Sequence, residues 1–159
     1  MPKMEKKLRI SNRRYLGSKL KLVDFIKDTI RKENIKFSSF LDLFAGTGVV
    51  GASFNNSNTE IVLNDILESN RCAYNSFMGS EPIDESKLIG FINLFNKKEV
   101  IEDNYFSLNF SDTFFSKKNC KKIGRIRDYI DKLFEDSLIN KREKDYLITS
   151  LLYAMDRIA

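Results

Sequence analysis

The sequence predicts an α/β fold in which parallel strands with flanking helices are followed by a mostly helical segment. Two short apolar runs, residues 38–45 and 59–66, have the length and β-rich composition of buried strands. Helical patterns precede, separate and follow these runs, and this alternation is typical of a parallel sheet. After residue 80 the sequence holds three amphipathic helical patterns and no comparable strand run.

The first helix is predicted over residues 18–34, after a polar and basic arm that covers residues 1–14. Its apolar residues recur at helical spacing, and Ser18 is available as an N-cap. Lysine and arginine near its end suit the negative pole of the helix dipole.

Two further helices are expected around the second strand. A glycine turn leads into a helix over residues 46–56. Residues 67–79 form another helical pattern, with one side made by Leu67, Asn70, Cys72, Ala73 and Phe77. The loop signal Gly-Ser-Glu-Pro at 79–82 then marks a boundary. We therefore expect two domains, residues 1–78 and residues 79–159.

The second half is expected to be mainly helical, with helices over residues 86–101, 120–138 and 141–159. Residues 105–119 are rich in aromatic and polar side chains, which indicates an irregular or short-strand segment. A doubly wound sheet needs more than two strands, and the last helix meets no glycine or proline stop before Ala159. We expect the natural polypeptide to continue, although a small αβ protein that ends here is the alternative.

Composition excludes several kinds of chemistry. The chain has no histidine and two cysteines, Cys72 and Cys120, so it lacks the ligands of a usual zinc site and the base of Ser-His or Cys-His catalysis. Both thiols are expected to be reduced and structural. The charged start and the absence of a long apolar run predict a cytoplasmic protein. The net charge of +5 is only weak evidence for a polyanionic partner.

The strongest local motif lies between the two predicted strands. Gly46, Gly48 and Gly51 satisfy the G-x-G-x-x-G spacing, which a nicotinamide enzyme would share. Asp42 stands just ahead of these glycines, where its carboxylate would repel a pyrophosphate. It suits instead the ammonium of an amino-acid-bearing cofactor such as S-adenosyl-L-methionine. The alternative for Asp42 is a solvated charge at the strand end.

A second candidate position lies at the end of the second predicted strand. Asp65 is placed to accept hydrogen bonds from the two hydroxyls of a ribose, and Ile66 offers an apolar face to an adenine ring. Both nicotinamide and S-adenosylmethionine cofactors carry a ribose, so Asp65 does not separate them. The alternative for Asp65 is a helix N-cap, a role that Asn64 could share.

These motifs resemble those of a known family. Asp42-x-Phe44-x-Gly46-x-Gly48 is similar to the first motif of Rossmann-like methyltransferases. Arg-Arg-Tyr-Leu-Gly-Ser-Lys at 13–19 resembles the stretch that begins the alpha-class, Dam-type DNA adenine methylases, and Asn-Asp-Ile at 64–66 matches a later motif of that family. The resemblance implies a partial Rossmann-like methyltransferase domain that binds S-adenosyl-L-methionine.

The residues that this resemblance assigns to the cofactor are Tyr15, Gly17, Lys19, Asp42, Phe44, Gly46, Gly48, Asp65 and Ile66. It implies that the Tyr15 ring packs on the cofactor and that the Lys19 ammonium pairs with its carboxylate. The alternative is that Tyr15 packs in the core and Lys19 is a solvated lysine at a helix start.

The resemblance also has implications for DNA and for catalysis. It places the later helices on the way to a DNA-recognition region, where phosphates of double-stranded DNA could meet a basic cluster: Lys117, Lys118, Lys121, Lys122, Arg125 and Arg127. The family transfers the methyl group with Asp-Pro-Pro-Tyr, but the only prolines here are Pro2 and Pro82, so we expect no catalytic residue in this chain.

The sequence therefore predicts the N-terminal cofactor-binding portion of a site-specific DNA adenine methyltransferase, of restriction-modification or phage type, that is inactive alone. The alternatives are an RNA methyltransferase fragment and a non-catalytic nucleotide-binding module. An unfinished sheet would expose an edge and apolar surface, so self-association is also expected.

Overall fold

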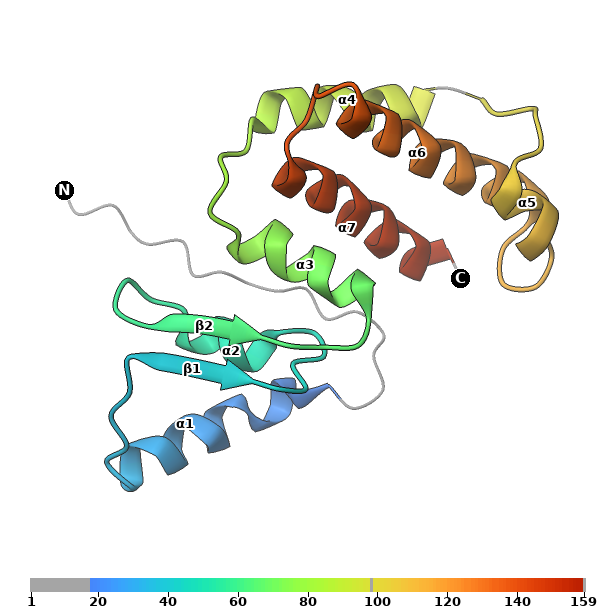
Figure 1. The fold of residues 1–159 in the computed structure, drawn as a ribbon. Helices are drawn as coiled ribbons and strands as arrows, with labels where there is room; N and C mark the ends of the chain where they lie inside the picture. The colour runs from blue at the N-terminus through green and yellow to red at the C-terminus, as the bar shows by residue number, and fades with distance from the viewer. Residues whose placement is uncertain (1–17, 98, 159) are drawn as a thin grey trace. The chain divides into compact units, whose positions relative to one another are not determined.

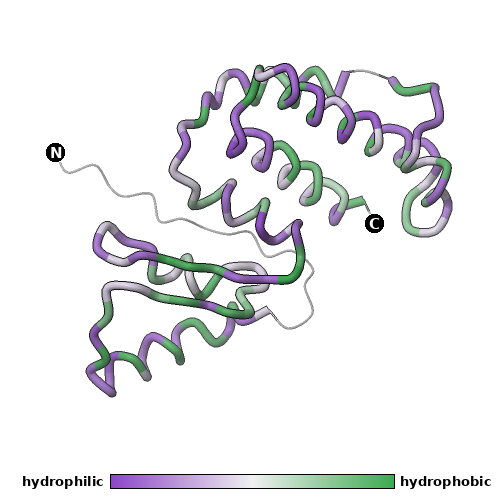
Figure 2. The backbone as a smooth tube through the Cα atoms, viewed as in Figure 1, coloured by the Kyte–Doolittle hydropathy of each residue, from purple (hydrophilic) through white to green (hydrophobic). Residues whose placement is uncertain are grey.

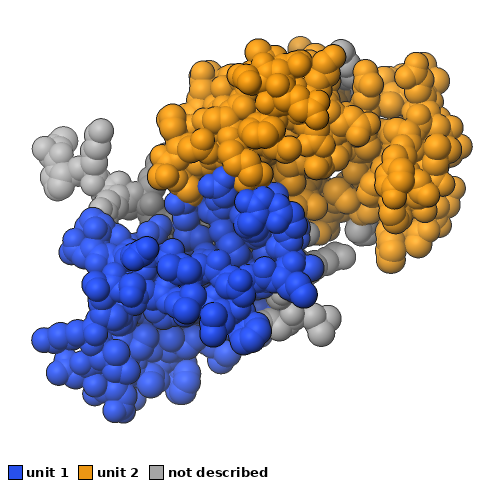
Figure 3. Space-filling model, viewed as in Figure 1, with its two compact units in different colours: residues 1–78 blue, residues 79–159 orange. Residues whose placement is uncertain are grey.

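The structure is a computed structural model that describes residues 18–97 and 99–158. The chain divides into two compact units, residues 1–78 and residues 79–159 (Figure 3). The first unit is mixed α/β, and the described part of the second contains helices as its regular elements (Figure 1). The prediction of an α/β fold followed by a mostly helical segment is therefore confirmed at this level.

The first unit is built around a small parallel sheet. In chain order its elements are η1 (Lys19–Leu22), α1 (Val23–Lys32), β1 (Ser39–Asp42), α2 (Val49–Phe54), β2 (Glu60–Leu63) and α3 (Glu68–Met78). Strands β1 and β2 pair in register from Ser39 with Glu60 to Asp42 with Leu63. Ser18 caps η1 as predicted, since its hydroxyl accepts a hydrogen bond from the Leu20 amide at 3.4 Å.

Both strands are shorter than the apolar runs that predicted them. Backbone hydrogen bonds continue beyond the strand ends, from the Asn64 amide to the Asp42 carbonyl and from the Ala45 amide to the Asn64 carbonyl, before the chain turns sharply. Gly46 and Gly48 then adopt left-handed φ angles of 55° and 75°, which a glycine reaches without steric cost. These two residues turn the chain from β1 into α2.

One face of the sheet is covered by α2. Gly51 makes the close approach possible, because a Cβ atom at this position would collide with the Leu63 side chain. On the same face the rings of Phe40 and Phe54 stack with centroids 4.7 Å apart. The hydropathy colouring shows that both strands are apolar over much of their length (Figure 2).

The opposite face of the sheet is open. Leu41 and Val62 are direct partners in the strand register, and they keep 56% and 44% of their surface exposed. Parallel sheets in folded proteins are normally covered on both faces. The first unit therefore presents an apolar sheet surface that no other described element of this unit covers.

The second unit consists of α4 (Glu85–Lys97), α5 (Tyr105–Phe110), α6 (Lys117–Glu135) and α7 (Lys141–Ile158). Its core is a cluster of aliphatic side chains: Leu88, Ile130, Leu133, Ile139 and Leu147. Cys120 is fully buried on α6, and Cys72 is buried on α3 of the first unit, both in reduced form. No helix in the described ranges is long and apolar enough to cross a membrane.

One sequence expectation in this unit was wrong. Residues 105–119 were expected to be irregular or a short strand, but they begin with helix α5. The helix is fixed by a capping box, in which the Asn104 side chain accepts from the Ser107 amide and the Ser107 hydroxyl accepts from the Asn104 amide. Helix α6 also starts earlier than expected, because Ser116 caps it ahead of Cys120.

Candidate cofactor-binding site

An open pocket of about 1000 Å³ lies in the first unit, beyond the carboxyl ends of β1 and β2. The loops that follow the two strands form most of its wall, and η1 contributes its start. Five of the residues predicted to bind cofactor line this pocket: Lys19, Phe44, Gly46, Asp65 and Ile66. Tyr15 and Gly17 lie outside the described residues.

Lys19 and Asp42 form an ion pair at the edge of this pocket. The Lys19 ammonium donates to the two carboxylate oxygens at 2.8 and 2.9 Å, and to the Phe44 carbonyl at 2.8 Å. Asp42 keeps only 9% of its surface exposed, so it is not the solvated strand-end charge of the alternative interpretation. The structure thus brings a cation and an anion together at the carboxyl end of β1.

The glycine turn lies next to this ion pair. Gly48 is the N-cap of α2, and a Cβ atom there would lie 2.9 Å from the Tyr74 ring. A side chain at position 48 is therefore excluded both by the backbone conformation and by lack of space. Gly46 and Thr47 of this turn line the pocket.

Asp65 accepts three hydrogen bonds from described residues. Its Oδ2 accepts from the Gly46 amide at 2.8 Å, while its Oδ1 accepts from the Leu67 amide at 2.9 Å and from Asn70 Nδ2 at 3.0 Å. Partial burial raises the pKa of Asp65, but these hydrogen bonds and the charge of Lys19 outweigh it and hold the pKa below its ordinary value. The side chain is thus a carboxylate that is fixed in orientation.

Two apolar side chains are freely accessible at this pocket. Phe44 is 82% exposed and Ile66 is 97% exposed, although both are large and hydrophobic. They follow β1 and β2 respectively, so the pocket is lined both by the charged groups Lys19 and Asp65 and by exposed apolar side chains. Exposed apolar residues that gather at a polar pocket are typical of a site for an amphipathic ligand.

Sequence reasoning missed Tyr74, and it treated Asn70 only as part of a helix side. Both are buried on α3, and each bonds to a residue that lines the pocket. The Tyr74 hydroxyl donates to the Gly46 carbonyl at 2.5 Å, and Asn70 holds Asp65. The available signal was their spacing of four residues, which places polar groups on one face of a helix directly after Asp65.

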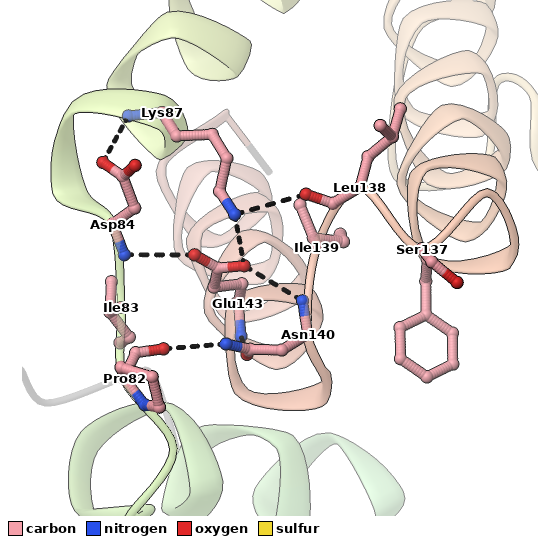
Figure 4. A pocket seen from close by; sticks show the side chains of 10 residues that line it. Pro82, Ile83, Asp84, Lys87, Ser137, Leu138, Ile139, Asn140 and Glu143 are labelled. Carbon is pink, nitrogen blue, oxygen red and sulfur yellow. Dashed lines mark hydrogen bonds and ion pairs between the residues drawn. The ribbon is translucent and has the colours of Figure 1, made fainter.

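A second pocket, of about 660 Å³, lies within the helical unit (Figure 4). Its centre is Glu143, which is 2% exposed. The carboxylate accepts from the Asp84 amide at 3.0 Å, from Lys87 Nζ at 2.7 Å and from the Asn140 amide at 3.0 Å. Burial raises the pKa of Glu143, but these donors hold it below its ordinary value. The charged and polar groups of this pocket are hydrogen-bonded to one another, which indicates a structural role for Glu143.

The basic cluster predicted to meet phosphates is largely paired with acidic neighbours. Lys117 and Lys121 each lie 3.4 Å from the Asp103 carboxylate. Lys118 lies 3.8 Å from Glu99, and Arg127 pairs with Asp131. These contacts reduce the positive charge that this face of α6 can offer to a polyanion.

A two-strand parallel sheet with a glycine turn and a pocket at the carboxyl ends of its strands defines an α/β protein with a candidate ligand site at that edge. Residues 15–159 match the family described as D12 class N6 adenine-specific DNA methyltransferase. The chain belongs to this family. No solved structure matches it.

Three curated relatives illustrate the similarity. The chain is 31% identical to Modification methylase LlaI of Lactococcus lactis subsp. lactis, over 92% of this chain and 25% of the relative. It is also 31% identical to Type II methyltransferase M.FokI of Planomicrobium okeanokoites, with the same coverage. Type II methyltransferase M.NlaIII of Neisseria lactamica is 26% identical over 91% of this chain and 46% of that protein.

The chain thus spans about a quarter of the length of the first two relatives. The prediction of an adenine-specific DNA methyltransferase family is confirmed.

Proposed function

We propose that the first unit binds S-adenosyl-L-methionine and that the chain is the cofactor-binding portion of a site-specific DNA adenine methyltransferase. The observation that carries this proposal is the Lys19–Asp42 ion pair at the pocket. The amino-acid tail of the cofactor has an ammonium and a carboxylate. Its ammonium can replace Lys19 on Asp42, while its carboxylate takes the Lys19 ammonium.

A dinucleotide fits this arrangement less well. Its pyrophosphate carries negative charge and no cation, so it would pair with Lys19 and leave the buried Asp42 carboxylate without a cationic partner, with the Phe44 amide donating to it at 3.3 Å. A buried carboxylate that loses its partner is strongly destabilising. The charge pattern therefore supports a zwitterionic ligand over a nicotinamide cofactor.

The other wall of the pocket suits an adenosine. A carboxylate offers about four lone-pair sites, and the three hydrogen bonds to Asp65 from described residues leave one site on Oδ2 for a ribose hydroxyl. Ile66 gives an apolar face to the adenine, and Phe44 contacts the cofactor beside it. Gly46 and Gly48 allow the close approach, and Tyr15 and Gly17 complete the proposed set.

The cofactor supplies the chemistry of the reaction, a methyl group on a sulfonium. The order of the motifs in this chain supports an alpha-class, Dam-type enzyme with a Rossmann-like cofactor domain. Methylation of adenine also needs acceptors for the flipped-out amino group. With Pro2 and Pro82 as its only prolines, the sequence has no Asp-Pro-Pro-Tyr to provide them. We therefore expect these 159 residues to bind cofactor without transferring its methyl group.

The full-length enzyme would act in the cytoplasm on double-stranded DNA. The names of the relatives, a modification methylase and type II methyltransferases, support a role in restriction-modification. A solitary phage-type enzyme is the second possibility for the same site. Self-association of the chain through the open sheet face at Leu41 and Val62 is also proposed.

Calorimetric titration of the 159-residue chain with S-adenosylhomocysteine and with NAD tests the cofactor proposal. We expect S-adenosylhomocysteine to bind and NAD to bind more weakly or not at all. Tighter binding of NAD would overturn the proposal, and binding of neither would favour a non-catalytic module. In a parallel assay with labelled S-adenosylmethionine and DNA, incorporation of label by the chain alone would contradict the expected inactivity.

A further inference from the structure

We infer that Asn70 and Tyr74 are positioning residues, which hold the two sides of the cofactor pocket in the geometry that binds the ligand. This inference rests on the proposed cofactor function of the pocket. Both residues belong to α3 and are separated by one helical turn, so they share one face of the helix. One holds the Asp65 carboxylate, and the other holds the glycine turn.

Asn70 determines the orientation of Asp65. Its side chain is buried, with 3% exposure, and its Nδ2 donates to Asp65 Oδ1 at 3.0 Å. The Leu67 amide donates to the same oxygen at 2.9 Å. Two donors at the start of α3 thus fix one carboxylate oxygen. The other oxygen, Oδ2, is thereby directed to the Gly46 amide, and its remaining acceptor site is directed to the proposed ribose hydroxyl.

Tyr74 holds the peptide groups of the glycine turn. Its hydroxyl donates to the Gly46 carbonyl at 2.5 Å, while the Gly46 amide donates to Asp65 at 2.8 Å. Gly46 is thus bound on both its amide and its carbonyl side. A glycine without these bonds would sample many backbone conformations, since it lacks a Cβ atom. The Tyr74 ring also lies directly against Gly48.

The contacts form a continuous hydrogen-bonded path from Asn70 through Asp65 and Gly46 to Tyr74. A phenylalanine at position 74 would fill the same space, so packing alone does not require the buried hydroxyl. Burial of a hydroxyl is costly unless it is hydrogen-bonded, and here its partner is the turn that faces the ligand. When a site is already held in its binding conformation, ligand binding costs less free energy for ordering its residues.

The test compares the chain with two variants, Tyr74→Phe and Asn70→Ala, and with a matched control, Tyr129→Phe. Tyr129 lies on α6 in the other unit, where its ring packs edge-on against Phe95. Three quantities are measured: the affinities for S-adenosylhomocysteine and its 2′-deoxy analogue, the hydrogen-exchange rate of the Gly46 amide without ligand, and the midpoint of thermal unfolding. Asn70→Ser, which keeps a short donor, replaces Asn70→Ala if that variant does not fold.

We expect Tyr74→Phe to weaken S-adenosylhomocysteine binding about three- to tenfold and to speed exchange of the Gly46 amide by a similar factor. Asn70→Ala should reduce the preference for S-adenosylhomocysteine over its 2′-deoxy analogue, because Asp65 is no longer held toward the ribose. A general loss of stability would weaken both ligands equally. Tyr129→Phe should change neither the affinities nor the exchange rate.

Unchanged affinity, ligand preference and Gly46 exchange in the folded variants would overturn the positioning role. A different outcome separates this inference from the proposed function. Suppose that the unaltered chain binds no S-adenosylhomocysteine but Tyr74→Phe still speeds exchange of the Gly46 amide. The cofactor proposal then fails, while the conclusion that Tyr74 fixes the glycine turn is still supported.

Discussion

Lys19 and Asp42 are 23 residues apart in sequence, yet the Lys19 ammonium lies within 2.9 Å of both carboxylate oxygens of Asp42. This ion pair connects the start of η1 to the end of β1. The two side chains keep 30% and 9% of their surface exposed, so the pair is partly shielded from solvent. A zwitterionic ligand can exchange with it without leaving either charge unmatched.

Replacement of Asp42 by asparagine should weaken S-adenosylhomocysteine binding about ten- to one hundred-fold, because a charge-assisted hydrogen bond to the ligand ammonium is lost. Calorimetric titration measures the change. Asp28→Asn is the matched control, since Asp28 pairs with Arg31 on the surface of α1. Equal affinity of Asp42→Asn and the unaltered chain would show that Asp42 does not receive the ligand.

The helical unit should lose stability in acid through Glu143. Its pKa in the folded chain lies below the ordinary value of 4.5. A carboxyl group whose folded pKa is lowered contributes stability above its unfolded pKa and loses it as the pH falls through the folded pKa. We therefore expect the free energy of unfolding to decrease as the pH drops below about 4.5. Asp131 and Asp103, whose pKa values are also lowered, should add to this decrease.

Glu143→Gln should remove the Glu143 share of that pH dependence and lower the free energy of unfolding at neutral pH by about 3 kcal/mol, because Lys87 loses a buried partner. Urea unfolding between about pH 3 and 7 measures both effects. Glu135→Gln, at an exposed position on α6, is the control. A pH profile identical to that of the unaltered chain would contradict the assignment.

Gly48→Ala and Gly90→Ala should have opposite effects on stability. Gly48 has a φ of 75°, and a Cβ atom there would press on the Tyr74 ring, so the substitution should cost about 1–2 kcal/mol or more. Gly90 lies inside α4, where a Cβ atom would meet nothing within 4 Å. Alanine there should add about 0.5–1 kcal/mol. Urea unfolding compares them, and a stabilising Gly48→Ala would contradict the left-handed turn.

Gly124→Ala should displace the cap of α5. A Cβ atom at Gly124 would overlap the Asn104 side chain, which accepts from the Ser107 amide and donates to the Lys121 carbonyl at 2.7 Å. Loss of this cap and the overlap together should cost about 1–3 kcal/mol. Hydrogen exchange of the Ser107 amide should speed up in the same variant. Unaltered exchange would show that the cap adapts.

Local patterns of the sequence predicted the parts of the site that depend on neighbours in the chain. The glycine spacing predicted a glycine turn that enters a helix after the first strand, and the structure gives its physical basis in the left-handed conformations of Gly46 and Gly48. Likewise, Ser18 caps the first helical turn as expected. Asp65 lies two residues after the end of β2, so its position at the pocket also follows from the order of elements.

Contacts between distant residues were not predictable in this way. Nothing in the local sequence indicates that Lys19 would reach Asp42 or that Tyr74 would bond to Gly46, because both pairs meet only when the sheet and its helices are packed. Helix α5 was missed for a different reason. Its six residues are too few for a clear helical period, and the capping box at Asn104 was the stronger signal.

The Glu143 contacts also have a consequence for the order of folding. Glu143 binds the Asp84 amide across 59 positions of the chain, and Asn140 binds the Pro82 carbonyl across 58. Contacts that close such long loops form late, because ordering the loop between the two residues costs conformational entropy. At a synthesis rate of about 5–20 residues per second, the segment before α4 waits about 3–12 seconds on the ribosome for its partner on α7. The helical unit can therefore complete its core only after α7 has been made.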